Sequence, residues 1–569
     1  MWFKDLALSK RPGQTLVTTL ADTYKVSNLF NDYRIVHAGK DLYKWKDDTA
    51  TLITTGALEE GVQDAAGVFV EFGDLMYYID GVEIWQITSS FVVSAVTAYK
   101  PVVLINAAPD LSSSDDNESY NLIGAGFTVW YNGDGTATYT LPQTSLDATE
   151  IVVVVGGVTK TKTTHYTWVA ATGVVTFTGG NEPTTGTNNV VITAYKTVSG
   201  NKSKIAKCTI ATPYGGEAAG VTGGTRVFVT GNPDEPYTYW KSDLGLHVGY
   251  GMTYFPDTFE EVLDQNSEAI TGAIKMGELL IVLKEESIFG IGYAYDGTDP
   301  YYPVRQLHDS IGCDMPGSIQ LIDNRVVFCN STNGVHALID YNVKDEKIVK
   351  PLSANINKLL LAESDLEDAC SVDYDQYYML CVNGNMYLWD YGKSPYKNYS
   401  DYDEAQRRLS WYRWSGISAL DFFYDTDLYY GGATGIVKFT SNKNDFDAAY
   451  DAYFKSKAFD FGLPTREKTF REVFPSFSSD GNIYATVAVA NEDTDEFDSE
   501  TYDIRSFDLG SFNLEVFTLD RIRFAKTYRQ KVKMKKCVYI QIIVSGNELN
   551  RGVGLSGLKF TYAVTREIK

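Results

Sequence analysis

Apolar and polar residues alternate along most of this chain in short runs that Gly, Asp or Asn residues separate. The clearest unit spans 21 to 23 residues and reads as three short strands joined by two tight turns. A weaker copy begins at Gly220, and Tyr33 opens part of another whose start is expected near residue 20. The pattern predicts an all-β protein. The best copies begin at Gly67, Gly272, Ser318, Cys370 and Ser418.

The spacing of these copies predicts the architecture. From Gly220 to Ser418, successive copies start 46 to 52 residues apart. A period of about 40–50 residues with several strands in each repeat is typical of a β-propeller. Counting the starts gives about seven blades. The interval from Gly67 to Gly220 is about one hundred residues longer than the others, which indicates an inserted segment.

The composition of the long interval predicts a separate domain. Residues 109–121 are polar and acidic, as expected for a linker, and residues 124–198 are rich in Thr and Val in alternating order. A second polar stretch, 199–204, is expected to connect this segment back to the repeats. Hairpin turns are expected at 132–135 and at Gly156-Gly157, so the segment reads as a small immunoglobulin-like β-sandwich. The predicted domains are propeller blades in 1–108 and 207–444, the inserted β-sandwich in 109–206, and a C-terminal β-sandwich or jelly-roll-like domain in 445–569.

Aromatic residues support this interpretation and helical patterns are sparse. The chain holds 40 Tyr and 28 Phe, which suit pleated, half-buried surfaces. Only 257–269 and 353–369 suggest short helices. Middle-strand residues are expected in the cores between blades, and these are Leu280, Val327, Leu380 and Tyr429.

The six cysteines show no C-x-x-C pair, so we expect buried thiols in a reducing compartment. A disulfide between two of them is left open. The N-terminal residues lack the pattern of a signal peptide. The longest apolar runs, 151–158 and 278–283, are too short to span a bilayer.

Charge and motifs exclude several classes of function. A net charge of −23 excludes a generally basic nucleic-acid binder. The chain lacks phosphate-loop, zinc-protease and serine-hydrolase signatures, and its five His residues have no metal-ligand spacing. We therefore expect no catalytic residues, no cofactor and no metal. A propeller-type glycosidase stays an alternative, because 73 Asp and Glu residues allow many carboxylate pairs.

One dense basic cluster, 526–537, stands out in this acidic chain. It has two interpretations: an edge strand that lysines protect from pairing with other chains, or a docking face for an acidic neighbour such as another copy of this protein. The candidate docking residues are Lys526, Arg529, Lys531, Lys533, Lys535 and Lys536.

Four stretches together carry a resemblance to a known group. They are RPGQTL (11–16), the segment 227–257 with Gly231-Asn232-Pro233 followed by 269–291 with the turn from Lys284 to Ile288, the segment 309–338, and the C-terminal 531–569. This combination resembles the propeller-bearing tail hub, nozzle or packaged-DNA-stabilisation proteins of tailed bacteriophages. The insert, with its YTW and TGVVTF strands, resembles small β-sandwiches that decorate phage tails and fibres.

The resemblance implies a structural virion protein that is assembled in the host cytoplasm. Its expected partners are copies of itself in a ring, with a hexamer as one option, the portal or adaptor, tail-fibre proteins, and genomic DNA that passes through without sequence-specific binding. The competing class is a carbohydrate-binding adhesin or receptor-binding tail protein, since aromatic rings stack on sugars. Blade packing is the alternative role for the tryptophans considered, which are Trp85, Trp240, Trp389, Trp411 and Trp414.

Overall fold

The chain folds into two compact units. The middle unit spans residues 20–371, and the terminal unit combines residues 1–19 with 372–569. A computed structural model describes residues 2–4, 7–54, 67–215, 226–244, 251–264, 268–297, 300–339, 349–392, 409–479, 483–491, 498–504, 526–549 and 552–567.

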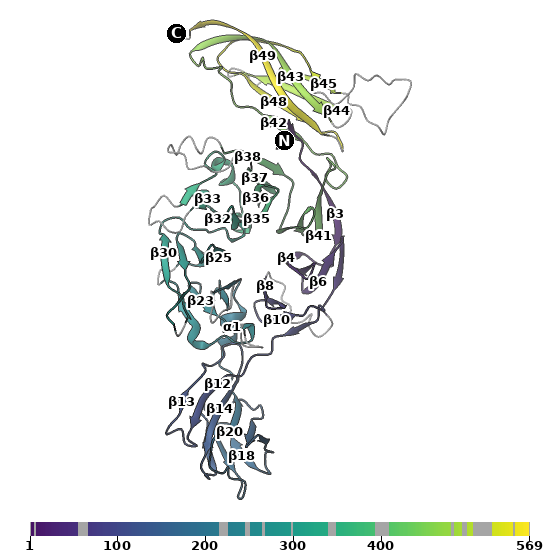
Figure 1. The fold of residues 1–569 in the computed structure, drawn as a ribbon. Coiled ribbons are helices and arrows are strands. Elements are labelled where there is room, and N and C mark those ends of the chain that lie inside the picture. The colour runs from purple at the N-terminus through teal and green to yellow at the C-terminus, as the bar shows by residue number, and fades with distance from the viewer. Residues whose placement is uncertain are drawn as a thin grey trace. The chain divides into compact units, whose positions relative to one another are not determined.

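The middle unit contains five antiparallel sheets of four strands each, which follow one another in chain order (Figure 1). The strands are β4 (Tyr24–Phe30), β5 (Tyr33–Ala38), β6 (Asp41–Lys46) and β7 (Thr49–Leu52); β8 (Val68–Phe72), β9 (Leu75–Ile79), β10 (Ile84–Ile87) and β11 (Val93–Ala95); β21 (Ile210–Tyr214), β22 (Arg226–Thr230), β23 (Thr238–Lys241) and β24 (Glu260–Val262); β25 (Ile270–Met276), β26 (Leu279–Lys284), β27 (Ile288–Ile291) and β30 (Val304–His308); and β31 (Gln320–Ile322), β32 (Arg325–Asn330), β33 (Gly334–Leu338) and β34 (Val349–Pro351). A two-stranded hairpin, β28 (Ala294–Tyr295) and β29 (Pro300–Tyr301), follows β27.

Neighbouring sheets of the middle unit pack through their first strands. Strand β8 lies against both β4 and β21, and β21 also lies against β25. The arrangement is that of blades in a β-propeller, where each sheet buries its faces against the next. Leu280 of β26 shares one core with Phe228 and Tyr239 of the preceding sheet. The middle-strand prediction is confirmed for burial, since Leu280, Val327, Leu380 and Tyr429 are each at most 5% exposed.

The repeat found in the sequence covers three of the four strands in these sheets. A fourth strand follows the three-strand unit that begins at Gly67, Gly272, Ser318 or Cys370. The weak copy placed at Gly220 is wrong in register, because its sheet already begins at Ile210. Gly220 itself lies outside the described residues.

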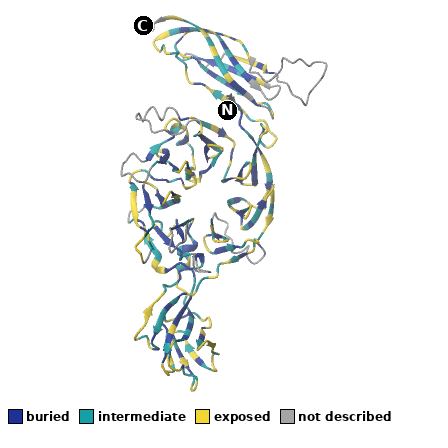
Figure 2. Ribbon diagram, in the orientation of Figure 1, coloured by how far each residue is buried: buried dark blue, intermediate teal, exposed yellow. Residues whose placement is uncertain are grey.

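The insert contains two β-sheets. A six-stranded sheet faces a three-stranded sheet across a core of apolar side chains, which Figure 2 shows as buried strand segments. Gly156 and Gly157 both have positive φ and form the expected tight turn. The strands are β12 (Val102–Ala107), β13 (Asp115–Asp116), β14 (Gly126–Gly133), β20 (Gly186–Tyr195), β16 (Val152–Val155) and β17 (Val158–Thr159), and then β15 (Thr138–Thr140), β19 (Val174–Phe177) and β18 (Tyr166–Val169).

The insert begins earlier than the expected boundary at residue 109. Strand β12 pairs in parallel with β14 and antiparallel with β13, so it belongs to the insert's sheet. The stretch 109–121, expected as a linker, contains β13. Strands β12 and β14 pair although no sequence repeat connects their segments. For this reason the composition of the chain placed the start of the insert too late, at residue 109.

Two of the four-stranded sheets in the terminal unit continue the series of repeats. One contains β35 (Cys370–Tyr374), β36 (Tyr377–Val382), β37 (Asn385–Asp390) and β38 (Trp411–Ser415). In the other, β39 (Asp421–Tyr424), β40 (Leu428–Gly432) and β41 (Gly435–Thr440) come from the last repeat copy. The N-terminal strand β3 (Gly13–Thr19) pairs with β41 and completes this sheet. Residues 13–19 therefore belong with the last repeat and not with the first.

The C-terminal region is a sandwich of two sheets, and the N-terminal residues join it through β2. Its core includes Phe470, Val487 and Val544. One sheet contains β1 (Trp2–Lys4), β2 (Ala7–Ser9), β49 (Val553–Glu567), β43 (Arg466–Ser479), β46 (Lys526–Thr527) and β47 (Gln530–Cys537). The other contains β42 (Ala452–Lys455), β48 (Gln541–Gly546), β44 (Ile483–Ala490) and β45 (Asp498–Ile504).

Helices are short throughout the described chain. Helix α1 (Asn201–Ala206) falls in a stretch expected to be a polar connection, and α2 (Asn357–Leu360) is the only α-helical part of the expected helix 353–369 within the described residues. The expected helix 257–269 is wrong: it contains a 3₁₀ turn, Asp257–Phe259, and then β24. Among the described residues, the structure has no helix with the length and apolar character that a membrane crossing requires.

The prediction that the cysteines are buried thiols is confirmed. All six cysteines are buried free thiols, and burial raises the pKa of the Cys313 thiol to about 11. Such a thiol stays protonated near neutral pH and behaves as a small core side chain.

Candidate functional site

The predicted basic cluster lies on β46 and β47 of the C-terminal sandwich. Side chains of β47 alternate between core and solvent: Val532 and Met534 are buried, whereas Lys531 and Lys535 are exposed. This is the two-residue period of a half-buried strand. The alternation places the described lysines of the strand on its solvent side.

A β-bulge at Lys536 extends this exposed face. Between Met534 and Cys537, β47 has one residue more than β43, and Lys536 has a φ of 59°. The extra residue returns Cys537 to the core, where it is fully buried. Lys535 and Lys536 are consequently both exposed, although they are consecutive in the sequence.

The cluster has one described ion pair. Arg529 donates from Nε to Glu472 Oε1 at 2.8 Å, and its side chain is 58% exposed. No acidic partner is recorded for Lys531, Lys535 or Lys536 within the described residues. The side chains of Lys526 and Lys533 lie outside the described residues. Strand β47 pairs only with β43 in the described sheet, so protection of a sheet edge stays an alternative role for these lysines.

The attachment of the insert to the blades is a second structured region. The chain leaves the blades at β12 and returns at 118–124 before leaving again at β14. Leu122 N donates to Phe255 O at 2.8 Å, and Tyr254 Oη donates to Ser119 O at 2.8 Å. Leu122, Ile123 and Ile205 belong to the core that also holds Trp240. The insert is therefore anchored by buried side chains at two places.

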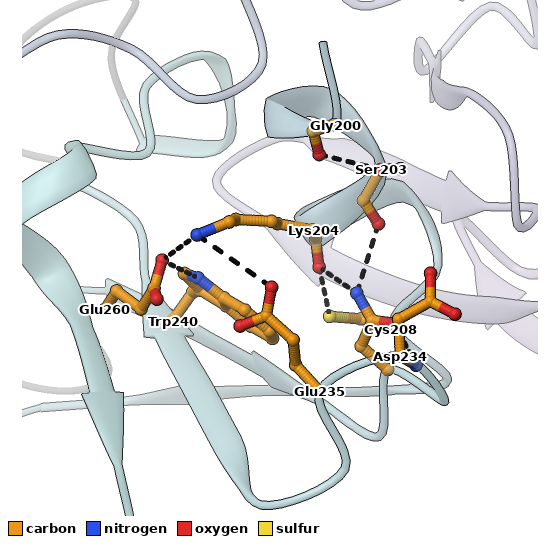
Figure 3. Close-up of polar contacts among 9 residues, drawn as sticks. Gly200, Ser203, Lys204, Cys208, Asp234, Glu235, Trp240 and Glu260 are labelled. Carbon is orange, nitrogen blue, oxygen red and sulfur yellow. Dashed lines mark hydrogen bonds and ion pairs between the residues drawn. The ribbon is translucent and has the colours of Figure 1, made fainter. Parts of the chain in front are cut away.

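Helix α1 fixes the returning chain through the cluster in Figure 3. Lys204 Nζ lies 2.6 Å from Glu260 Oε2 and 3.9 Å from Glu235 Oε1. Trp240 donates its indole N–H to the same Glu260 oxygen at 3.1 Å. The Cys208 thiol donates to Lys204 O at 3.2 Å. A carboxylate that accepts both an ammonium and an indole hydrogen bond holds α1 in one position against β23 and β24.

Two more lysines extend this attachment. Lys202 pairs with Glu83 at 2.6 Å, and Lys207 pairs with Asp234 at 2.6 Å. Each pair is partly exposed, so it contributes at most about 1 kcal/mol and mainly sets position. The sequence predicts only a polar connection at 199–204. The three lysines Lys202, Lys204 and Lys207, just before Cys208, are the signal in the sequence for this attachment.

The five tryptophans considered as sugar-stacking residues differ in their exposure to solvent. Trp85, Trp240, Trp389 and Trp414 are at most 5% exposed, which confirms blade packing as their structural role. Trp411 is half-buried and lies on β38. In the described parts of the chain, His, Cys, Asp and Glu side chains form no group of three or more that could hold a metal ion.

Comparisons with known proteins give no family. No protein-family model matches the chain, and no curated protein matches it. Similar solved structures include PorZ, a surface component of the type-IX secretion system of Porphyromonas gingivalis, at 11% identity and a TM-score of 0.34; the match covers 75% of this chain and 37% of PorZ. The chain thus spans little more than a third of that protein.

The WD40 domain of Neurospora crassa Pan2 matches at 8% identity and a TM-score of 0.32, covering 76% of this chain and 96% of that domain. The WD40 domain of SCAP from fission yeast matches at 8% identity and a TM-score of 0.29, covering 78% and 97%. TM-scores below 0.5 at such identities do not establish a shared function.

Proposed function

We propose that this chain is a non-enzymatic structural component of a bacteriophage tail. As a hub or nozzle ring below the portal and adaptor, it forms part of the DNA conduit and a platform for tail fibres. The support is the sequence resemblance carried by RPGQTL and the other stretches named above. An all-β body with blade sheets and two sandwiches suits a rigid scaffold.

Within this proposal, seven of the eight four-stranded sheets in the described chain, all except the one that contains β42, form one seven-bladed propeller. Strand β3 completes the sheet of β39–β41, so the last blade combines both ends of the repeat region. Because β3 precedes the first sheet and pairs with the last, the hydrogen bonds of one sheet tie the two ends of the repeat region together.

The observation that carries the proposal is the distribution of charge around the exposed lysines of β47. Residues 445–569 hold 18 Lys and Arg against 19 Asp and Glu, so nearly all of the net charge of −23 belongs to residues 1–444. Lys531, Lys535 and Lys536 face solvent. A basic strand on one region and an acidic excess on another are complementary between copies, as a head-to-tail ring contact requires.

The acidic excess also suits a conduit. Symmetry repeats each carboxylate that faces the lumen in every copy of a closed ring. DNA, which carries one negative charge per about 1.7 Å of helix axis, is repelled by such walls and does not bind them. The proposed partners are therefore other copies of the chain, the portal or adaptor and the fibres, with DNA passing through the lumen.

The test is the oligomeric mass of the purified full chain and of two charge-matched variants. The first changes Lys531, Lys535 and Lys536 to Glu. The control changes Lys40, Lys46 and Lys457, which are also exposed, to Glu. Wild type and control should form one closed oligomer that high salt weakens, and the β47 variant should stay a folded monomer. A monomeric wild type, or rings from the β47 variant, would contradict the proposed contact.

A further inference from the structure

The outer face of the insert's six-stranded sheet exposes a tryptophan that sequence analysis did not single out. Trp130 of β14 is 38% exposed, whereas its neighbours Val129 and Tyr131 are buried in the core of the insert. This alternation is that of a half-buried strand. The Trp130 ring therefore lies on the solvent side of the sheet.

Cross-strand pairing places uncharged side chains beside Trp130. Val191 of β20 pairs with Trp130 on one side and with Val154 of β16 on the other, and both valines are partly exposed. The sequences of β14, β20, β16 and β17 contain no charged residue, although residues 102–195 hold eight Asp and Glu against two Lys. With about 4.8 Å between neighbouring strands, these four strands present an uncharged surface about 14 Å wide.

Three asparagines form a polar cluster at the end of β14 that follows Trp130. Asn132 Oδ1 accepts a hydrogen bond from Asn188 N at 2.8 Å, and Asn132 Nδ2 donates to Asn106 O at 3.3 Å. Asn188 Nδ2 donates to Asn106 Oδ1 at 3.0 Å, and Asn106 Nδ2 donates to Asp115 Oδ2 at 2.8 Å.

These bonds fix the carboxamides and leave each with hydrogen-bonding capacity. The three asparagines are half-buried. Each side-chain nitrogen has two hydrogens and makes one hydrogen bond within the described residues, so a second N–H is available to a ligand. Donors that are already held in place lose little entropy when a ligand binds.

We propose that this face of the insert binds a neutral saccharide. The C–H face of a sugar ring packs on Trp130, and sugar hydroxyls exchange hydrogen bonds with the carboxamides of Asn132 and Asn188. Carboxamides suit hydroxyls because both groups donate and accept. A large aromatic ring suits a ligand whose ring faces are apolar and whose edges are polar.

Charge favours this ligand over two others. The uncharged strands offer no partner for an ionic group, and the acidic excess of the insert repels an anionic saccharide. The same excess opposes the face-to-face contact of two inserts from two copies of the chain. The site lies within the insert, so the inference does not depend on the proposed ring.

The probes are the neutral hexasaccharides cellohexaose, maltohexaose and hexa-N-acetylchitohexaose, titrated calorimetrically into the full chain, with hexagalacturonic acid as the charged comparison. At least one neutral probe should bind, at least about tenfold more tightly than hexagalacturonic acid. Trp130→Ala should weaken that binding by at least about tenfold, and Trp130→Tyr, which keeps a ring, by less than about threefold. Val169→Ala is the matched control, since Val169 is 54% exposed on the insert's other sheet, and it should leave binding unchanged.

Melting curves check that the variants fold. If Trp130→Ala lowers the melting temperature, Trp130→Lys replaces it, because its long stem still covers the sheet without an aromatic face. Trp130→Lys should lose the same affinity.

Four results would overturn the inference. They are no binding of any neutral probe by the wild type, equal losses in Val169→Ala, equally tight binding of hexagalacturonic acid, and full affinity in a folded Trp130 variant without a ring. A smaller oligomeric mass for Trp130→Ala, without saccharide binding by the wild type, would assign this face to a second copy. Closed rings without saccharide binding would reject this inference alone, whereas a monomer that binds saccharide would reject the proposed ring alone.

Discussion

Arg11 and Asp445 form a bidentate ion pair although 434 residues separate them in the chain. Nη1 lies 2.9 Å from Oδ1, and Nη2 lies 2.5 Å from Oδ2. Three residues further on, the fully buried Gln14 donates to Gly416 O and accepts a hydrogen bond from the Tyr430 hydroxyl. The RPGQTL stretch therefore joins the N-terminus to the sheet of β39–β41.

Breaking this ion pair should destabilise the terminal unit. Arg11 and Asp445 are 6% and 16% exposed, so Arg11→Met leaves a carboxylate in a mostly buried site. We expect a loss of about 3–5 kcal/mol in the free energy of unfolding, measured by chemical denaturation. Glu150→Ala, which breaks the exposed pair with Lys162, should cost at most about 1 kcal/mol. Equal losses in the two variants would show that burial of the pair is not what matters.

Leu280 tests the packing between blades. Leu280→Ala removes a side chain that is 1% exposed and lies in the core shared by two sheets. The unfolding free energy should fall by about 2–5 kcal/mol. Leu29→Ala, at a position that is 55% exposed, should change it by less than about 0.5 kcal/mol. A loss of that small size at Leu280 would place it outside the core.

The insert is anchored to the blade core at residues 122–123 and at Ile205, so the effect of deleting the insert should depend on whether these residues are kept. Replacing 102–117 and 126–195 by short Gly/Ser linkers keeps 118–125 in place and should leave a soluble, cooperatively melting protein. Replacing 110–206 as one block removes Leu122, Ile123 and Ile205 from the blade core and should abolish soluble expression. Similar melting curves for both deletions would mean that these side chains are not needed.

Lys10 predicts a pH dependence. Burial lowers the pKa of its ammonium from 10.5 to about 8, against the opposing attraction of Asp445. Between these values the unfolded chain binds more protons than the folded chain, so the unfolding free energy should rise with pH from about 8 to about 10.

Lys10→Met removes the titrating group, so the difference in melting temperature between wild type and variant should change across this range. Parallel curves for the two proteins through the same pH range would refute the assignment to Lys10.

Local patterns predicted the local structure well. The continuous apolar runs around Leu280 and Leu380 identified buried strands, and the Gly156-Gly157 pair identified a turn, because each depends on neighbouring residues only. The pairing of β3 with β41 and of β12 with β14 joins distant segments, and no local period encodes it. Leu122 and Ile123, an apolar pair beside a polar stretch, were the available signal for the second anchoring point.

In the basic cluster, too, the feature that depends on distant residues was not predicted from the sequence. The sequence predicted either an edge strand protected by lysines or a docking face, and Lys531 and Lys535 are exposed in the structure. The bulge at Lys536 was not predicted, because a positive φ at a lysine depends on its fit to β43 and Cys537.

The most direct test of the proposed role is electron cryomicroscopy of the virion that carries this chain. The tail should show this chain in a closed ring below the portal, with a central channel wide enough for duplex DNA and β47 at the contact between copies. Density for the chain confined to the fibres, or its absence from the tail axis, would contradict the conduit.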